Sequence, residues 1–424
     1  MTGVLKVLVD ILSVPSVLVG LIALLGLVAQ RKPVEVVISG ALKTTLGFII
    51  LGSGAGVVIN AIVPLGDILQ HGFNIKGVIA VNEVVIAVAQ KQFGTEMALT
   101  MVAGFIANIL LALVLPWKYI FLSGHHTLFM ATVAVAVLGA GAGFTGIPLI
   151  LAGALVIGFS SIFFPAISAP FMRKITGGDD FVMGHWGTTG YCLSGLIGKY
   201  VGNPEDSTEN IKLPSWANFM REPLIAMGIV MSVVYIIAVL KAGPEFVATK
   251  SGGQWPLLYA VMQGLLFAGG IGVILLGVRM ILAEIVPAFR GFAERIVPKS
   301  KPALDCPVVF PYAPNALLIG YLFSTLGGIV AMFVQVAAGW TVMVPSMIIH
   351  FFCGGSAGIF GNATGGKKGA MVGAFAHGIL VTLLSGFLYP LMGSLGFANT
   401  TFGDSDFSIM GILLGFLAKL AGGK

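Results

Sequence analysis

The sequence predicts an all-α polytopic membrane protein with roughly ten or eleven transmembrane helices, some of them broken or re-entrant. Of its 424 residues, 57% are hydrophobic and only 9% are charged, and the mean hydropathy is +1.01. Such a chain has too little polar surface to coat a soluble globule. Apolar segments of about 20 residues, the length that spans a bilayer, follow one another, and short polar breaks interrupt several of them.

The apolar segments can be placed in order along the chain. The first ends at the positive stop Arg31-Lys32, which is expected on the cytoplasmic side, with the N-terminus outside. The segment at 72–94 is too short for a comfortable full span, so we expect a helical hairpin that dips partway into the bilayer. The segments lie at about 11–29, 40–64, 72–94, 97–115, 127–138, 147–164, 223–240, 257–282, 316–336, 342–352, 370–388 and 409–420.

A polar midpoint loop at 198–222 divides the chain into two halves that resemble each other. FIILGSGAGVVINAIVP at 48–64 is similar to VILLGVRMILAEIVP at 273–287, with a two-residue gap. Glu83 lies 19 residues after the first motif, and Asp305 lies 18 residues after the second. We therefore expect a single membrane domain, 1–424, with internal repeats at about 1–200 and 223–424. Such repeats are typical of transporters that bind substrate near the bilayer midplane.

The candidate binding residues lie in four polar breaks. An ionisable group inside a membrane segment costs about 3 kcal/mol on insertion scales, so it is a functional hypothesis by default. Glu83, His125, His185 and Asp305 lie in or near such breaks, and the longest break is GGDDFVMGHWGTTGY at 177–191. Each of the four alone could instead cap a half-helix or satisfy a buried carbonyl. Together they favour a binding site, whereas the two aspartates of GGDD are compatible with a turn in water.

Soluble-type catalysis has no support in the sequence. There is no nucleophile elbow, P-loop or pair of metal ligands at helical spacing, so we expect no catalytic residue, no metal site and no cofactor. Cys192, Cys306 and Cys353 are widely spaced, which argues against a metal cluster or a disulfide framework. The formal charge of +6 is expected from Lys and Arg on cytoplasmic loops, and no nucleic-acid partner is expected.

Six motifs are spread along the chain: FLSGHHTLFM, FVMGHWG, GNPEDSTENIKLPSW, GVRMILAEIVPAFRG, ALDCPVVFPYAPNALLIG and GIFGNATGGKKGA. Together they resemble the membrane-embedded IIC component of the L-ascorbate-type phosphotransferase system (PTS) permease. The resemblance implies a multi-pass protein of the bacterial cytoplasmic (inner) membrane and a homodimer, with a scaffold and a mobile substrate-carrying core that moves as an elevator. It also implies IIA and IIB partners, of which IIB transfers the phosphoryl group, so the chain alone is not an enzyme.

The resemblance also implies substrate contacts in the same four breaks. This chain departs from the family pattern, which has glutamines at the positions of Phe129 and Trp186 and a Thr-Tyr pair at Val81-Asn82. Trp186 could stack on a ring while His and carboxylate groups hydrogen-bond hydroxyls. The implied contacts are Asn82, Glu83, His125, His126, Thr127, Leu128, Phe129, His185, Trp186 and Asp305.

The leading expectation is a permease for L-ascorbate, and two alternatives stay open. Ascorbate is a monoanion at neutral pH, so a pocket with Glu83 and Asp305 needs a protonated carboxylate or a charged histidine to compensate. A neutral sugar or alditol, handled by the same class of permease, would avoid this requirement. The other alternative is a secondary transporter in which one of these carboxylates couples transport to protons.

Overall fold

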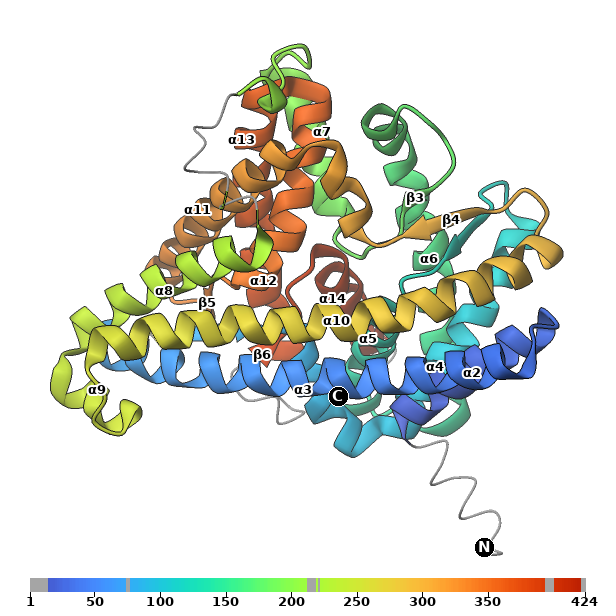
Figure 1. Cartoon of the computed structure of the whole chain (residues 1–424), viewed down its shortest axis with the longest axis horizontal. Helices are drawn as coiled ribbons and strands as arrows, with labels where there is room; N and C mark the ends of the chain where they lie inside the picture. Colours follow the sequence, from blue (N-terminus) through green and yellow to red (C-terminus); the bar gives the residue numbers. More distant parts are fainter. Residues whose placement is uncertain (1–13, 74–76, 212–218, 220–221, 393–399, 421–424) are drawn as a thin grey trace, which may run out of the picture.

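The computed structural model describes residues 14–73, 77–211, 219, 222–392 and 400–420, and these residues are mostly helical. This confirms the polytopic all-α class, because seven helices in the described ranges are long and apolar enough to cross a membrane. Other predicted spans, such as 127–138, lie in shorter helices next to strands (Figure 1). The seven are Val34–Phe73, Gln92–Val114, Gly146–Thr176, Leu224–Ala242, Pro256–Gly277, Pro314–Ala338 and Met347–Met392.

Two helices of 40 and 41 residues, α3 (Val34–Phe73) and α10 (Pro256–Ile296), lie side by side. Each is about 60 Å long, twice the hydrocarbon thickness of about 30 Å, so each must tilt steeply or extend beyond the hydrocarbon. Glycines allow their backbones to approach, and a Cβ on Gly54 would lie 2.6 Å from the nitrogen of Ile274. The long-helix layer consists of these two helices with α2 (Pro15–Ala29), α8 (Pro223–Ala242) and α9 (Pro244–Ser251).

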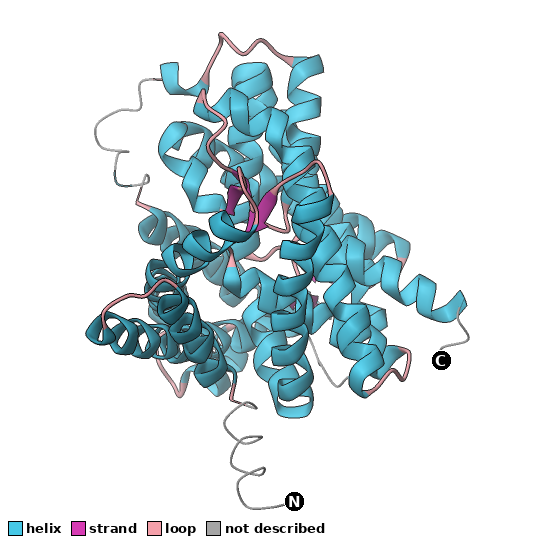
Figure 2. Cartoon of the chain, turned by 90° about the vertical axis from the view of Figure 1, so that its right-hand side faces the viewer, coloured by secondary structure: helices cyan, strands magenta, loops and turns pink. Residues whose placement is uncertain are grey.

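The remaining helices enclose the strands, as Figure 2 shows, and form what we call the strand-bearing core. In it, α13 (Gly355–Met392) packs against α11 (Pro314–Ala338) and α7 (Thr188–Val201), while α4 (Asn82–Val114) packs against α6 (Gly146–Thr176). The other helical elements are α5 (Gly124–Ala134), the π-helices η1 (Val135–Gly141) and η5 (His350–Gly354), the 3₁₀ helices η2 (Thr208–Asn210) and η4 (Cys306–Tyr312), α12 (Met347–Ile349) and α14 (Ser405–Leu420).

Two small parallel sheets, absent from the sequence-based prediction, connect the two halves of the chain. In one sheet β1 (Gly77–Ala80) pairs with β5 (Val342–Val344) and β6 (Thr400–Thr401). In the other, β4 (Lys301–Leu304) pairs with β2 (Tyr119–Phe121) and β3 (Val182–Met183). Each central strand follows a long helix and pairs with strands of the opposite half. The pairing satisfies backbone groups that extended segments would otherwise leave without partners in an apolar environment.

The two sheets have the same register. Gly77 stands opposite Val342 in one sheet, as Lys301 stands opposite Tyr119 in the other. The last residues of the two central strands are also matched, because they face the last residues of β6 and β3. The sequence predicts a helical hairpin for the segment 72–94. In its described part from residue 77 onward, it consists of strand β1 followed by the start of α4.

The midpoint loop is tied to the core as far as residue 211. Thr208 is fully buried, and its backbone N–H donates to Asn362 Oδ1 at 2.8 Å. Glu209 accepts from two backbone N–H groups at the start of α11, both at 3.0 Å. A carboxylate at this position stabilises the helix N-terminus. Most of the loop from 212 to 221 lies outside the described residues.

Candidate functional site

The carboxyl ends of the two sheets bring residues from the predicted breaks together. His125 lies in the first turn of α5 just after β2, His185 follows β3 and Asp305 follows β4. Asn82 follows β1, and Asp404 follows β6. Because the strands in each sheet are parallel, their carboxyl ends meet at one edge. The side chains after them therefore converge from distant parts of the sequence.

His185 lies between two carboxylates. Its Nε2 is 3.7 Å from Asp305 Oδ1 and 3.8 Å from Asp404 Oδ1. His125 approaches the same site from α5, with its Nε2 at 3.6 Å from Asp305 Oδ2. These distances exceed hydrogen-bond lengths, so the carboxylate oxygens keep acceptor capacity for hydroxyl groups of a ligand.

The ring of His185 is oriented by its other nitrogen. The backbone N–H of Gly187 donates to Nδ1 at 3.1 Å, and the hydroxyl of Tyr191 lies 2.8 Å from the same nitrogen. With Nδ1 accepting, the proton of the neutral imidazole is on Nε2. The donor N–H then points toward the carboxylates.

Asp404 is a site residue that the sequence analysis missed. Its side chain is only 2% exposed, and it accepts hydrogen bonds from Asn82 Nδ2 and, at 2.9 Å, from Cys353 Sγ. Asn82 is itself held by the backbone N–H of Gly403 at 2.9 Å. The sequence contains a signal for this residue. Asp404 follows Gly403 in the polar break before the last apolar segment, just as His185 follows Gly184 in its own break.

The break that carries His185 is locked to its neighbours. Gly184 donates its N–H to the carbonyl of Leu304 at 2.6 Å and accepts from Ser123 Oγ at 2.5 Å. A Cβ on Gly184 would lie 2.4 Å from the backbone carbonyl of Ala303, so only glycine fits. Close backbone approach thus fixes where the imidazole lies.

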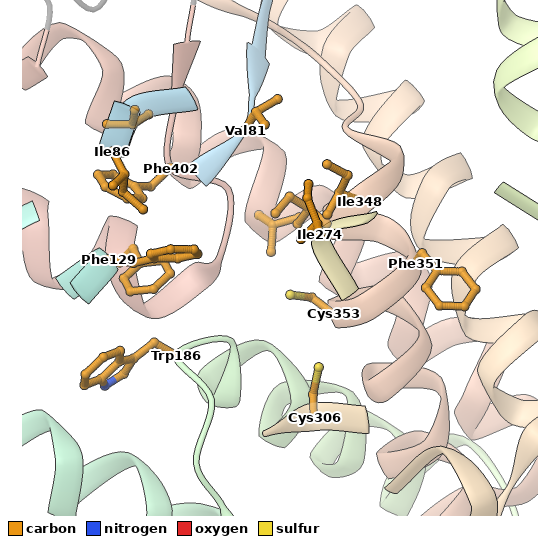
Figure 3. Packing of buried hydrophobic residues seen from close by; sticks show 14 of the residues in the cluster. Val81, Ile86, Phe129, Trp186, Ile274, Cys306, Ile348, Phe351, Cys353 and Phe402 are labelled. Carbon is orange, nitrogen blue, oxygen red and sulfur yellow. The ribbon is translucent and has the colours of Figure 1, made fainter. Parts of the chain in front are cut away.

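Trp186 is fully buried and does not line the cavity described below. Its ring stacks on Phe121, with centroids 4.3 Å apart and 19° between the planes. In Figure 3 the Trp186 side chain points away from the space between Cys306 and Cys353. In this conformation the indole is therefore part of the packing behind the site and cannot stack on a ligand in the cavity.

The other predicted residues divide between the cavity and the core. His126 and Phe129 line the cavity, whereas Leu128 is part of the hydrophobic core. Thr127 Oγ1 donates back to the carbonyl of Ser123 at 3.3 Å and does not line the cavity. Glu83 is the second residue of α4, and its side chain lies outside the described part of the structure.

Asp179 lies away from the cavity, at the end of α6. It forms ion pairs with Lys301 and, at 3.5 Å, with Arg173. The hydrogen bond from the Lys301 ammonium lowers the pKa of the Asp179 carboxyl below its usual value. This aspartate therefore ties the loop to strand β4 and does not contact the site.

A cavity of about 360 Å³ opens beside these groups, within the usual size range for small-molecule sites. The strand-bearing core supplies its histidines and carboxylates, and α10 of the long-helix layer supplies its opposite wall. Arg279 on α10 is the only Lys or Arg among the described lining residues. The lining is Asn82, Leu122, Ser123, His125, His126, Phe129, His185, Ile271, Ile274, Leu275, Arg279, Leu304, Asp305, Cys306, Pro307, Val308, Phe310, Ile348, Ile349, Phe351, Phe352, Cys353 and Asp404.

Comparison with known proteins matches residues 10–406 to the model of a family described as EIIC-GAT, the PTS system sugar-specific permease component. A curated relative, the ascorbate-specific PTS system EIIC component of Mycoplasma pneumoniae, is 27% identical over 420 residues. The alignment covers 86% of this chain and 63% of the relative, so the chain spans less than two thirds of that protein's length.

The helices and the family agree on the class of protein. The seven apolar helices and the family match together identify the chain as a multi-pass transport protein of the bacterial inner membrane. The motifs singled out in the sequence, including those around His125, His185 and Asp305, all lie within the matched residues 10–406. The chain belongs to the EIIC-GAT family of PTS sugar-specific permease components.

Proposed function

We propose that this chain is the permease subunit that binds L-ascorbate, or a close relative, and carries it across the membrane for phosphorylation by a IIB partner, with IIA upstream. The main support is the cavity in which His125 and His185 meet Asp305 and Asp404. A second support is the Mycoplasma pneumoniae relative, which is named as an ascorbate-specific EIIC component. The chemistry of the phosphoryl transfer belongs to IIB in this proposal.

The cavity suits a small polyhydroxylated ring. Carboxylates accept hydrogen bonds from hydroxyls, the Nε2–H of His185 donates one, and the low polarity of the surroundings strengthens each bond. Aliphatic and aromatic side chains, among them Phe129, Ile274 and Phe351, form the other walls. This combination of a few polar groups with apolar walls is usual for small-molecule sites.

The charge of ascorbate is compensated in this proposal by Arg279. Asp305 and Asp404 both lie within 4 Å of His185, so an anion entering beside them needs a nearby cation. Arg279 lines the cavity from α10, and its guanidinium supplies a positive charge there. The guanidinium attracts an anion to the mouth of the site.

A neutral alditol or sugar is the second candidate substrate. It is favoured by the same two carboxylates, because a neutral ligand is not repelled by them. The departure from the family pattern at Phe129, which lines the cavity, also fits a changed substrate. Proton-coupled uptake by a carboxylate, the third possibility, receives no support from membership in a PTS family.

The test is group translocation in vesicles that contain the purified chain with matching IIA and IIB proteins. Labelled ascorbate should enter and appear inside as ascorbate phosphate, and only when phosphoenolpyruvate is supplied through the phosphotransferase chain. Uptake of unmodified ascorbate driven by a pH gradient would overturn the proposal. If labelled alditols are phosphorylated and excess ascorbate does not compete, the neutral substrate is the correct one.

We also propose that the chain is a two-repeat protein that works as an elevator in a homodimer. The matched registers of the two sheets support the repeats. The long-helix layer would be the scaffold, and the strand-bearing core would carry the substrate. The cavity between α10 and the polar side chains is where such a movement would open and close the site.

A further inference from the structure

Two histidines and a carboxylate meet at the cavity with the spacing of metal ligands. One nitrogen each of His125 and His126 and one oxygen of Asp305 all lie within 4.8 Å of one another. Within this group, His125 Nε2 and Asp305 Oδ2 are 3.6 Å apart. In a tetrahedral zinc site with bonds of about 2.0–2.2 Å, neighbouring ligand atoms are about 3.4 Å apart.

The two imidazoles have nitrogens without protein partners. Nδ1 of His125 and Nδ1 of His126 are buried and have no hydrogen-bond partner among the described residues, although His126 is only 3% exposed. A buried polar atom without a partner is unusual and calls for an explanation. Because Nδ1 of these rings holds no protein hydrogen bond, its proton can shift to suit whichever nitrogen coordinates an ion.

The carboxylate is already oriented for a ligand. Asp305 Oδ1 accepts from the backbone N–H of Cys306 at 2.7 Å, which leaves Oδ2 directed toward His125. Such hydrogen bonds to the non-coordinating atom are the usual way in which proteins orient metal-binding groups. Two histidines and one carboxylate with open positions are a ligand set typical of Zn²⁺ and Fe²⁺ sites.

We propose that His125, His126 and Asp305 bind a divalent transition-metal ion of the Zn²⁺ type, and that this ion competes with the transported sugar. The ion takes the Asp305 oxygen that would accept a sugar hydroxyl. Its positive charge also offsets the two neighbouring carboxylates of Asp305 and Asp404, which otherwise share a poorly hydrated site. The sequence gives little sign of this, because adjacent histidines do not have the i, i+4 spacing of helical metal pairs.

The metal site is tested without any sugar, on the full chain in lipid nanodiscs. Isothermal titration with ZnCl₂ should show one saturable site per chain, and Co²⁺ should give the visible absorption of a tetrahedral complex. His125→Ala and Asp305→Asn should weaken the Zn²⁺ affinity at least about tenfold, whereas His71→Ala, on the exposed end of α3, should leave it unchanged. Asp305→Asn keeps the side-chain size, and size-exclusion profiles confirm that each variant is folded.

Competition is measured next, with labelled ascorbate and a labelled alditol as probes. Zn²⁺ should raise the apparent Kd of whichever sugar binds, linearly with the free zinc concentration. Absence of a saturable zinc site, or zinc binding unaffected by both variants, overturns the metal site, and unchanged or tighter sugar binding at saturating zinc overturns the competition. The metal site rests on the cavity alone, and the competition rests also on the proposed function. If zinc binds but ascorbate does not, only the proposed substrate fails, and the reverse result removes only the metal site.

Discussion

His185 lies within 4 Å of both carboxylates of the site, Asp305 and Asp404. Its loss should therefore reduce substrate binding more than the loss of a residue at the edge of the cavity. We expect His185→Ala and Asp305→Asn each to abolish uptake while the chain remains folded. Each variant loses a hydrogen bond that involves a charged group, worth about 2 kcal/mol, so substrate affinity should fall about thirtyfold. Equilibrium binding of labelled substrate and phosphorylation-coupled uptake in vesicles measure the two effects.

The matched control for these variants is His71→Ala. His71 stacks on Phe246 with centroids 3.9 Å apart and lies at the exposed end of α3, so its loss should leave uptake unchanged. If His185→Ala and Asp305→Asn both transport normally, the substrate site is elsewhere.

Arg279 should discriminate between the two candidate substrates. In Arg279→Gln the cavity loses its one guanidinium, so binding of an anion should weaken about tenfold and become less sensitive to salt, whereas binding of a neutral alditol should barely change. Arg279→Lys keeps the charge and should retain most of the anion affinity. Titrations of each variant with ascorbate and with an alditol at low and high ionic strength provide the comparison; equal losses for both ligands would show that the arginine acts through packing.

Individual site residues were predictable when a polar group interrupted an apolar run. This signal identified His125, His185 and Asp305. In the structure, Nε2 of each histidine lies within 4 Å of an oxygen of Asp305. Asp404 has the same signal but was not singled out. The position of Trp186 could not be predicted, because an indole suits both a ligand wall and a packed interior, and only the contact with Phe121 shows which of these the fold uses.

At the scale of elements, the parallel pairing of β3 with β4 controls where His185 lies. A Cβ on Gly184 would meet the Ala303 carbonyl, so Gly184→Ala should push the two strands apart, at a cost of about 1–3 kcal/mol, and displace the imidazole. We expect substrate binding to be lost and the thermal unfolding temperature to fall. Gly178→Ala is the matched control in the same stretch, because its nearest contact, at 3.6 Å, is ordinary. Equal melting temperatures and equal substrate binding for the two variants would contradict the role of the β3–β4 pairing in positioning His185.

Helices and strands differed in how well the sequence predicted them. Long apolar runs such as those of α6 and α11 have the length and composition of spans, so they could be identified directly. The strands have two to four residues, too few for an alternating pattern to be visible. Their pairing joins segments more than 120 residues apart, such as Tyr119 and Lys301 or Val182 and Ala303, and no local pattern reports it.

The whole molecule combines two layers with a site between them. The echo between 48–64 and 273–287 falls on α3 and α10, which pack together. Each of these helices is followed by the central strand of one sheet, and each central strand pairs with the opposite half of the chain. Any movement of the core relative to α10 therefore changes the cavity, because its polar groups and its opposite wall belong to different layers.

A cross-link between the layers should stop transport without preventing binding. Ile274 on α10 and Ile348 on α12 both line the cavity, one from each layer, and both are labelled in Figure 3. In a chain whose three native cysteines are replaced by alanine and which still transports, Ile274→Cys with Ile348→Cys is joined by a reducible cross-linker.

If the strand-bearing core moves against α10, the joined chain should bind substrate but transport it at least about tenfold more slowly. Reduction of the linker should restore the rate, and the single variant Ile274→Cys treated with the same reagent should transport normally. Mass spectrometry reports the fraction joined. Transport at the full rate by a fully joined chain would mean that the layers move as one body and that the substrate crosses by another route.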